Sequence, residues 1–204
     1  MITNPSPVAA LIGLGKMGAN MVRRLARAGV PVAAFDVAAA ARATLGQEAR
    51  VSVAATLADA VALLPRPRVV WLMLPAGEPS ETTLTALAAL LAAGDVIVDG
   101  ANADYRDSMR HAAEAAARGV LFVDAGVSGG VWGLANGYGL MLGGTPQALA
   151  PVLPLARARA RPRSRLGALR AAGRGPLRQD GPQRHRIRTD AGLRRGLRAD
   201  ARQA

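Results

Sequence analysis

VAALIGLGKMGANMVRRLARAGVPVAAFD, residues 8–36, decides the fold of this chain. The stretch opens with a short apolar run that ends in glycines, which is typical of a buried strand in a parallel sheet. Apolar residues then recur at helical spacing up to Gly29, a typical helix stop, and VPVAAFD predicts a second strand. This order predicts two parallel strands joined by a crossover helix.

The alternation of strands and helices continues outward from this unit to about Val152. It predicts an α/β fold over residues 1–152, a Rossmann-type, mostly parallel sheet with helices on both faces. We expect further strands near Val51 and over residues 68–75, 95–100, 120–125 and 137–144, and helices over residues 37–45, 57–64, 81–92 and 105–118, with another opening near Pro146.

Three glycines join the first expected strand to its helix with the spacing Gly-x-Gly-x-x-Gly. Gly13 permits a tight turn, Gly15 lets the backbone approach a pyrophosphate, and Gly18 lets the helix pack closely on the strand. The helix N-terminus offers N–H groups and its positive dipole end to phosphates. The pattern predicts a dinucleotide site, although a glycine turn without a ligand has the same local signature. The expected cofactor contacts in this loop are Gly13, Leu14, Gly15, Lys16, Met17 and Gly18.

Asp36 stands at the end of the second expected strand, eighteen positions after Gly18. A carboxylate there accepts hydrogen bonds from the adenosine ribose hydroxyls and repels a 2′-phosphate. Asp36 therefore favours NAD over NADP as the cofactor. The alternative is that Asp36 only caps the following helix, and the nearby Arg42 weakens the preference against a phosphate.

Three further stretches sit where strands end, which is where open α/β sheets bind their ligands. They are LMLPAGEPSE (72–81), DGANADYRDS (99–108) and DAGVSGGVWGLANG (124–137). Each alone is compatible with a turn, a helix start or a flexible loop, but their joint occurrence indicates a ligand crevice. The candidate contacts there are Leu74, Pro75, Ala76, Asn102, Ser128, Gly129 and Gly130.

The net charge of +12 is unevenly distributed along the chain. Residues 1–152 carry eleven basic and eleven acidic side chains, whereas residues 153–204 carry fifteen arginines and three aspartates. The front domain is therefore neutral, as expected of a metabolic enzyme, and lacks the basic surface that nucleic-acid binding requires. We expect a small-molecule substrate and no nucleic-acid partner.

Composition also excludes several classes of protein. The chain has no cysteine, and its two histidines, His111 and His185, lie far apart, so we expect neither a disulfide nor a metal site. No basic segment precedes the first apolar run, and no apolar run approaches the roughly 20 residues of a membrane span. We expect a cytoplasmic protein without a signal peptide or a membrane partner.

Together these motifs resemble the 6-phosphogluconate dehydrogenases, within the wider β-hydroxyacid dehydrogenase group. The likeness runs from about Val8 to Gly144, through IGLGKMGANMVRRL, VVWLMLPAGE, DGANADYRDS and VDAGVSGGVWGLANGYGLMLGG, and is greatest to the shorter NAD-type branch. The 3-hydroxyisobutyrate dehydrogenases share the fingerprint and the Ser-Gly-Gly, so action on a smaller β-hydroxyacid stays open. Trp132 and Gly133 favour the phosphogluconate branch, whereas Ala101 stands where the family commonly has glycine.

The resemblance implies NAD-dependent oxidation of 6-phosphogluconate at C3 and loss of CO2 to give ribulose 5-phosphate, a step of the pentose phosphate pathway. Residues 74–76 would lie along the cofactor, Asn102 between nicotinamide and substrate, and residues 128–130 near the substrate carboxylate. In the family a lysine and a glutamate act as general base and acid. Both come from an all-helical second domain, through which these enzymes form homo-oligomers.

Residues 153–204 depart from this resemblance. The only lysine is Lys16, inside the fingerprint, so the general base is missing. A one-base regrouping of possible codons turns GPLRQDGPQRHRIR, residues 175–188, into GHFVKMVHNGIEY, which resembles the family's catalytic segment. Our hypothesis is a helical domain read in a shifted frame, giving an Arg-rich tail without a stable fold and an inactive chain. The alternatives are a genuine disordered tail and an RNA-binding Arg/Gly segment, although the tail has no aromatic residue for base stacking.

Overall fold

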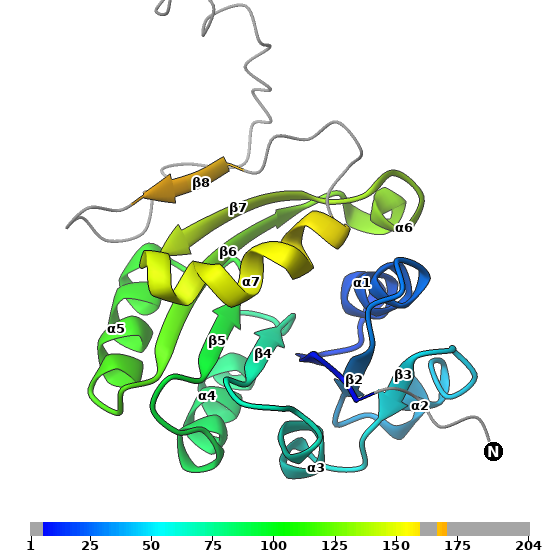
Figure 1. Cartoon of the computed structure of the whole chain (residues 1–204), viewed down its shortest axis with the longest axis horizontal. Coiled ribbons are helices and arrows are strands. Elements are labelled where there is room, and N and C mark those ends of the chain that lie inside the picture. The colour runs from blue at the N-terminus through cyan, green and yellow to red at the C-terminus, as the bar shows by residue number, and fades with distance from the viewer. Residues whose placement is uncertain (1–5, 160–166, 171–204) are drawn as a thin grey trace, which may run out of the picture.

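The computed structural model describes residues 6–159 and 167–170, which form a twisted sheet with helices on both faces (Figure 1). The strand order is β3-β2-β1-β4-β5-β6-β7-β8. Strands β1 to β6 pair in parallel, β7 is antiparallel to β6, and β8 is parallel to β7. The strands are β1 Ala9–Ile12, β2 Val32–Phe35, β3 Val51–Val53, β4 Val69–Leu72, β5 Val96–Asp99, β6 Leu121–Ser128, β7 Gly139–Gly144 and β8 Gly167–Arg170. The helices are α1 Lys16–Arg27, α2 Ala39–Ala43, α3 Leu57–Ala62, α4 Glu78–Leu90, α5 Tyr105–Ala116, the 3₁₀ turn η1 Gly130–Trp132, α6 Gly133–Asn136 and α7 Pro146–Arg159.

Two apolar layers hold the helices to the sheet. On one face, Met21, Val22 and Leu25 of α1 belong to a buried cluster that also includes residues of α7. On the other face, Val61 of α3 and Leu87 of α4 belong to a second cluster. Strands β1, β4 and β5 are buried along their whole length between these layers, which explains their continuous apolar sequences. The carboxyl ends of these parallel strands meet at one edge of the sheet.

The structure confirms the predicted Rossmann-type fold, with a mostly parallel sheet covered on both faces. Two local expectations were incomplete. Helix α4 begins at Glu78, three residues early, because Gly77 adopts a φ of 92° at the N-cap and Pro79 suits the first helical turn. Residues 130–136, expected to be a loop, form η1 and α6.

Helix α7 crosses the expected domain boundary at residue 152 and continues to Arg159. Leu155 and Ala156 are buried in the same cluster as Val152, so the apolar face of the helix persists for another turn. Pro151 and Pro154 lie inside this helix, and arginines follow at 157 and 159, so the sequence pattern alone predicts an earlier end.

The expectation of a tail without a stable fold, over residues 153–204, therefore needs correction at its start. Residues 153–159 belong to α7, and Gly167–Arg170 form the edge strand β8 (Figure 1). The remaining residues, 160–166 and 171–204, lie outside the described part of the chain, and so do the shifted-frame segment at 175–188 and the RNA-binding alternative. Of the helices described, none has the length and apolar character needed to cross a membrane.

Candidate functional site

The glycine loop between β1 and α1 shows two different uses of glycine. Gly13 has a φ of 92°, and a Cβ there would lie 2.6 Å from the carbonyl oxygen of Met73. A Cβ on Gly18 would overlap the carbonyl oxygen of Gly13. Gly15 differs, because a Cβ there would meet no protein atom within 4 Å. Packing explains the first and third glycines, whereas Gly15 leaves its backbone bare toward open space.

An open hollow of about 340 Å³ lies beside Gly15, at the N-terminus of α1. Gly15 is the N-cap, no side chain caps this end of α1, and its first turn has no acidic residue. The first N–H groups and the positive dipole end therefore face the hollow without an internal anion, which suits a phosphate. The residues that line it are Leu14, Gly15, Lys16, Ala19, Asn20, Arg23, Thr44 and Val131.

Asp36 follows β2 and is tied to the glycine loop. Its Oδ2 accepts a hydrogen bond from the Leu14 N–H at 2.7 Å, and its Oδ1 accepts one from the Ala38 N–H at 2.8 Å. Ala38 is the N-cap of α2, so Asp36 does help to start that helix. Each carboxylate oxygen has a second lone pair, so these bonds leave capacity for ribose hydroxyls.

Arg42 is engaged by the backbone at the end of β2. Its guanidinium donates to the carbonyl oxygens of Asp36 at 2.7 Å and Val37 at 3.2 Å, and it lies 6.0 Å from the centre of the Phe35 ring. Both hydrogen bonds use Nη1, so the guanidinium keeps further N–H donors on its other nitrogens.

The other candidate residues follow neighbouring strands at the same edge. Leu74 lies against the glycine loop, with its Cδ2 2.9 Å from the position of a Cβ on Gly13, and Pro75 and Ala76 continue from it. Asn102, after β5, accepts a 3.5 Å hydrogen bond from the Val127 N–H of β6 through its Oδ1. The structure therefore brings Leu74 to the glycine loop, and Asn102 to the strand that ends in Ser128.

The segment after Ser128 docks on α1. A Cβ on Gly133 would overlap the ring of Tyr138, which is fully buried. The Tyr138 hydroxyl donates to the carbonyl oxygen of Met17 at 3.4 Å, and Arg24 donates to that of Leu134 at 3.1 Å. These contacts place η1, which begins at Gly130, and α6 beside α1. Sequence reasoning missed Tyr138 and Arg24. Each stands inside a motif quoted above, but nothing in the sequence indicates that the two segments make contact.

Beneath the loops after β5 and β6 lies a polar cluster that sequence reasoning also missed. Asp99 and Asp124 face each other in the register of the two strands. Burial raises the pKa of Asp99, while burial and the nearby Asp99 charge raise the pKa of Asp124 to about 6. A hydrogen bond from Ser108 to Asp124 opposes part of this shift. His111 completes the cluster.

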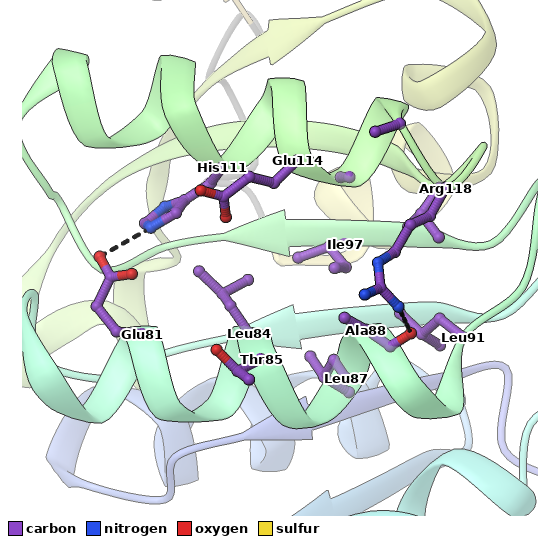
Figure 2. Close-up of a pocket in the computed structure, with 13 residues that line it drawn as sticks. Glu81, Leu84, Thr85, Leu87, Ala88, Leu91, Ile97, His111, Glu114 and Arg118 are labelled. Carbon is purple, nitrogen blue, oxygen red and sulfur yellow. Dashed lines mark hydrogen bonds and ion pairs between the residues drawn. The ribbon is translucent and has the colours of Figure 1, made fainter.

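His111 projects from α5 toward α4, where its Nε2 lies 2.9 Å from Glu81 Oε1 (Figure 2). Arg110 also donates to Glu81 at 2.6 Å, and this hydrogen bond, with the one from His111, lowers the pKa of Glu81 to about 2. The side chains of His111 and Glu81 lie at one end of a cavity of about 380 Å³ between α4 and α5, with a mostly apolar lining. Among the described residues, no set of three His, Asp or Glu side chains is arranged to hold a metal ion.

Comparison with known proteins adds the family context. A family model described as the NAD binding domain of 6-phosphogluconate dehydrogenase matches residues 8–167. The decarboxylating 6-phosphogluconate dehydrogenase of Drosophila melanogaster is 40% identical over 153 residues, which are 73% of this chain and 32% of the relative. That of Treponema pallidum is 39% identical over 150 residues, 71% of this chain and 30% of the relative. The chain spans about a third of the length of these curated relatives.

Solved structures show the same fold. One is the 6-phosphogluconate dehydrogenase of Plasmodium falciparum, determined in apo form, with its cofactor NADP+ and with its substrate 6-phosphogluconate. It superposes with a TM-score of 0.71 at 26% identity, covering 76% of this chain and 34% of that one. The 3-hydroxyisobutyrate dehydrogenase of Mycobacterium tuberculosis with L-serine superposes with a TM-score of 0.69 at 32% identity, covering 76% of this chain and 53% of that one.

Proposed function

Since the chain belongs to the family of the NAD-binding domain of 6-phosphogluconate dehydrogenase, we propose that it binds NAD in the crevice at the carboxyl edge of its sheet. Residues 13–18 hold the pyrophosphate, and Asp36 holds the adenosine ribose. The observation that carries this proposal is the bare backbone at Gly15, which opens on a hollow at an uncapped helix N-terminus. A dinucleotide pyrophosphate needs this approach and this positive dipole end.

The position of Asp36 supports NAD rather than NADP. Its carboxylate is fixed beside the glycine loop by two backbone N–H groups, so a 2′-phosphate on the ribose would be held close to a negative charge. Arg42 contacts the Asp36 and Val37 carbonyl oxygens through Nη1 alone, so it keeps donors for a phosphate and the preference for NAD rests on Asp36. The relative from Plasmodium falciparum binds NADP+, so the two nucleotides must be compared directly on this chain.

The family reaction we propose is the oxidative decarboxylation of 6-phosphogluconate to ribulose 5-phosphate. NAD, when bound, supplies the acceptor for the hydride of C3. Residues 74–76 line the cofactor, Asn102 orients the substrate toward it, and residues 128–130 bind the sugar acid near its carboxylate. A second candidate is oxidation of a smaller β-hydroxyacid, which is favoured by the 32% identity to the 3-hydroxyisobutyrate dehydrogenase.

The chain as written is proposed to bind the cofactor without turnover. Proton transfer requires a general base within hydrogen-bond reach of the substrate hydroxyl. The only lysine among the 204 residues is Lys16, which belongs to the glycine loop. Absorbance of reduced nicotinamide should stay flat when NAD and 6-phosphogluconate are added, and measurable turnover would contradict this. The nucleotide sequence tests the shifted frame, which fails if no one-base regrouping between codons 153 and 165 restores an open frame.

Calorimetry on the 204-residue chain tests the cofactor proposal. NAD should bind, and NADP at least about tenfold more weakly, which corresponds to about 1.4 kcal/mol. Gly15→Ala should leave the thermal transition in place and weaken NAD binding, because its methyl group meets no protein atom within 4 Å but occupies the ligand space. Gly143→Ala is the matched control, since its methyl group makes only a 4.0 Å contact with Asp124 on β6. No heat with either nucleotide from the folded chain would sink the proposal.

A further inference from the structure

We propose that His111 is a positioning residue for the nicotinamide end of the crevice, acting through Asp99 on the loop that carries Asn102. The inference rests on the proposed function, because it concerns the same cofactor site. His111 lies outside the crevice, on α5, and its link to that site runs through a series of polar contacts beneath the sheet edge.

The first contact fixes the histidine ring. Its side chain is almost fully buried, and its Nε2 lies 2.9 Å from Glu81 Oε1 on α4, as Figure 2 shows. A carboxylate oxygen only accepts hydrogen bonds, so Nε2 is the donor and carries a proton. Phe122 of β6 packs beside the ring, with the two ring centres 6.3 Å apart. The ring is therefore held from α4 and from the sheet.

The second contact joins the ring to the end of β5. His111 Nδ1 lies 3.9 Å from Asp99 Oδ2, and both atoms are buried. Neither atom has a hydrogen-bond partner among the described residues. An unpaired buried polar atom is costly, so each of these atoms has the other as its best available partner. With Nε2 engaged by Glu81, Nδ1 is the ring atom that faces Asp99 Oδ2.

The third contact sets the loop itself. Asp99 Oδ1 accepts a 2.9 Å hydrogen bond from the Ala101 N–H. At Gly100, a Cβ would lie 2.8 Å from the Leu72 carbonyl oxygen, so the backbone there runs directly against β4. Asn102 then adopts a φ of 54°, a left-handed conformation that disfavours most side chains. Asparagine tolerates this conformation better than most residues, and the Asp99 carboxylate, which holds the Ala101 N–H, helps to set the loop that leads to it.

The charged groups around Asp99 explain why a histidine is needed. Asp124 lies opposite Asp99 on β6, and its charge repels that of Asp99. The Ser108 hydroxyl of α5 serves Asp124, not Asp99. Arg110 faces Glu81, Asp107 and Glu114 on the exposed side. His111 is therefore the side chain placed to restrain Asp99 Oδ2, with its Nδ1 3.9 Å away.

The test compares NAD with ADP-ribose, which lacks the nicotinamide. His111→Gln removes the atom that faces Asp99 and keeps an amide near Glu81. We expect NAD affinity to fall about fivefold, or about 1 kcal/mol, with ADP-ribose affinity unchanged within about twofold. Arg110→Gln is the matched control, because Arg110 contacts Glu81 and does not reach Asp99; both affinities should stay at the wild-type values.

Two outcomes overturn the inference. In one, His111→Gln changes neither affinity; in the other, it lowers both equally, as a purely structural role would. If His111→Gln does not fold, Asp99→Asn replaces it, because its amide oxygen still accepts from Ala101 while its Oδ2 is lost, and the same split between NAD and ADP-ribose is expected. A wild-type chain that binds neither nucleotide rejects the proposed function itself, and this result is distinct from wild-type binding that His111→Gln leaves unchanged.

Discussion

Strand β5 has a buried aspartate at each end, and the two carboxylates have different surroundings. Asp95, just before the strand, accepts hydrogen bonds from the Arg68 N–H at 2.8 Å and the Ala92 N–H at 3.0 Å, and lies 3.8 Å from the Arg68 guanidinium. Asp99, at the other end, accepts one from Ala101 and has Oδ2 unpaired beside Asp124 and His111. Both carboxylate oxygens are satisfied at the amino edge, whereas one is left without a hydrogen bond at the carboxyl edge, where α/β sheets bind their ligands.

The largest expected effect on stability comes from replacing aspartate by asparagine at either end of β5 and comparing the two losses. Asp95→Asn should lower the free energy of unfolding by about 2 kcal/mol, because its amide NH2 must face one of two backbone N–H donors. Asp99→Asn should cost less than about 1 kcal/mol, because the amide oxygen still accepts from the Ala101 N–H and the lost Oδ2 makes no hydrogen bond in the folded chain. Denaturant titration measures both, and equal losses would mean that the two edges do not differ.

A smaller effect on stability is expected at Asp124, and it should depend on pH. The pKa of Asp124 is raised from 3.8 to about 6, so between these values the folded chain binds more protons than the unfolded chain. Stability contributed by this group therefore falls as pH rises through this window. Asp124→Asn removes the charge beside Asp99 and should stabilise the protein by about 1 kcal/mol near neutral pH, after allowance for partial exposure.

Below the ordinary pKa of Asp124, 3.8, the gain from Asp124→Asn should disappear. Thermal unfolding of the wild type and the variant across this range provides the measurement. A gain that stays constant with pH would show that the benefit comes from packing and not from the removed charge. The hydrogen bond from Ser108 is retained in the variant, because the amide oxygen still accepts it.

The smallest effect is expected at the exposed end of the polar cluster. Glu81 is partly exposed and carries the ion pair with Arg110, so Glu81→Gln should cost only about 0.5 kcal/mol near neutral pH. The pKa of Glu81 is lowered from 4.5 to about 2, so its stabilising effect is present above about 4.5 and is lost as pH falls toward 2. Added salt should reduce the difference between variant and wild type, and a cost as large as that of Asp95→Asn would contradict this ranking.

Local patterns in the sequence predicted the fold and the glycine turn between β1 and α1 well. Gly13, Gly15 and Gly18 lie within six residues, and their roles depend on a strand and a helix that adjoin them in the chain. The end of α7 was predicted too early, since the burial of Leu155 depends on what the helix packs against. The roles of the individual site residues stay predictions until cofactor binding is measured.

Contacts between distant segments left no readable pattern. Tyr138 reaches Met17 across 121 positions. The pairing of Asp99 with Asp124 appears only once β5 and β6 are aligned in register, and His111 joins them only because α5 turns that face inward. Spacing along the chain carries no information on such register, so the cluster beneath the crevice was not found from sequence.

Tyr138 joins α1 to the segment after Ser128. Its ring packs against Gly133, and its hydroxyl donates to the Met17 carbonyl oxygen. Because one buried side chain contacts both segments, we expect a displacement of α1 to be transmitted to the segment after Ser128. The glycine loop and the Ser-Gly-Gly turn are therefore coupled through Tyr138, so a substitution that loosens this contact should alter both segments together.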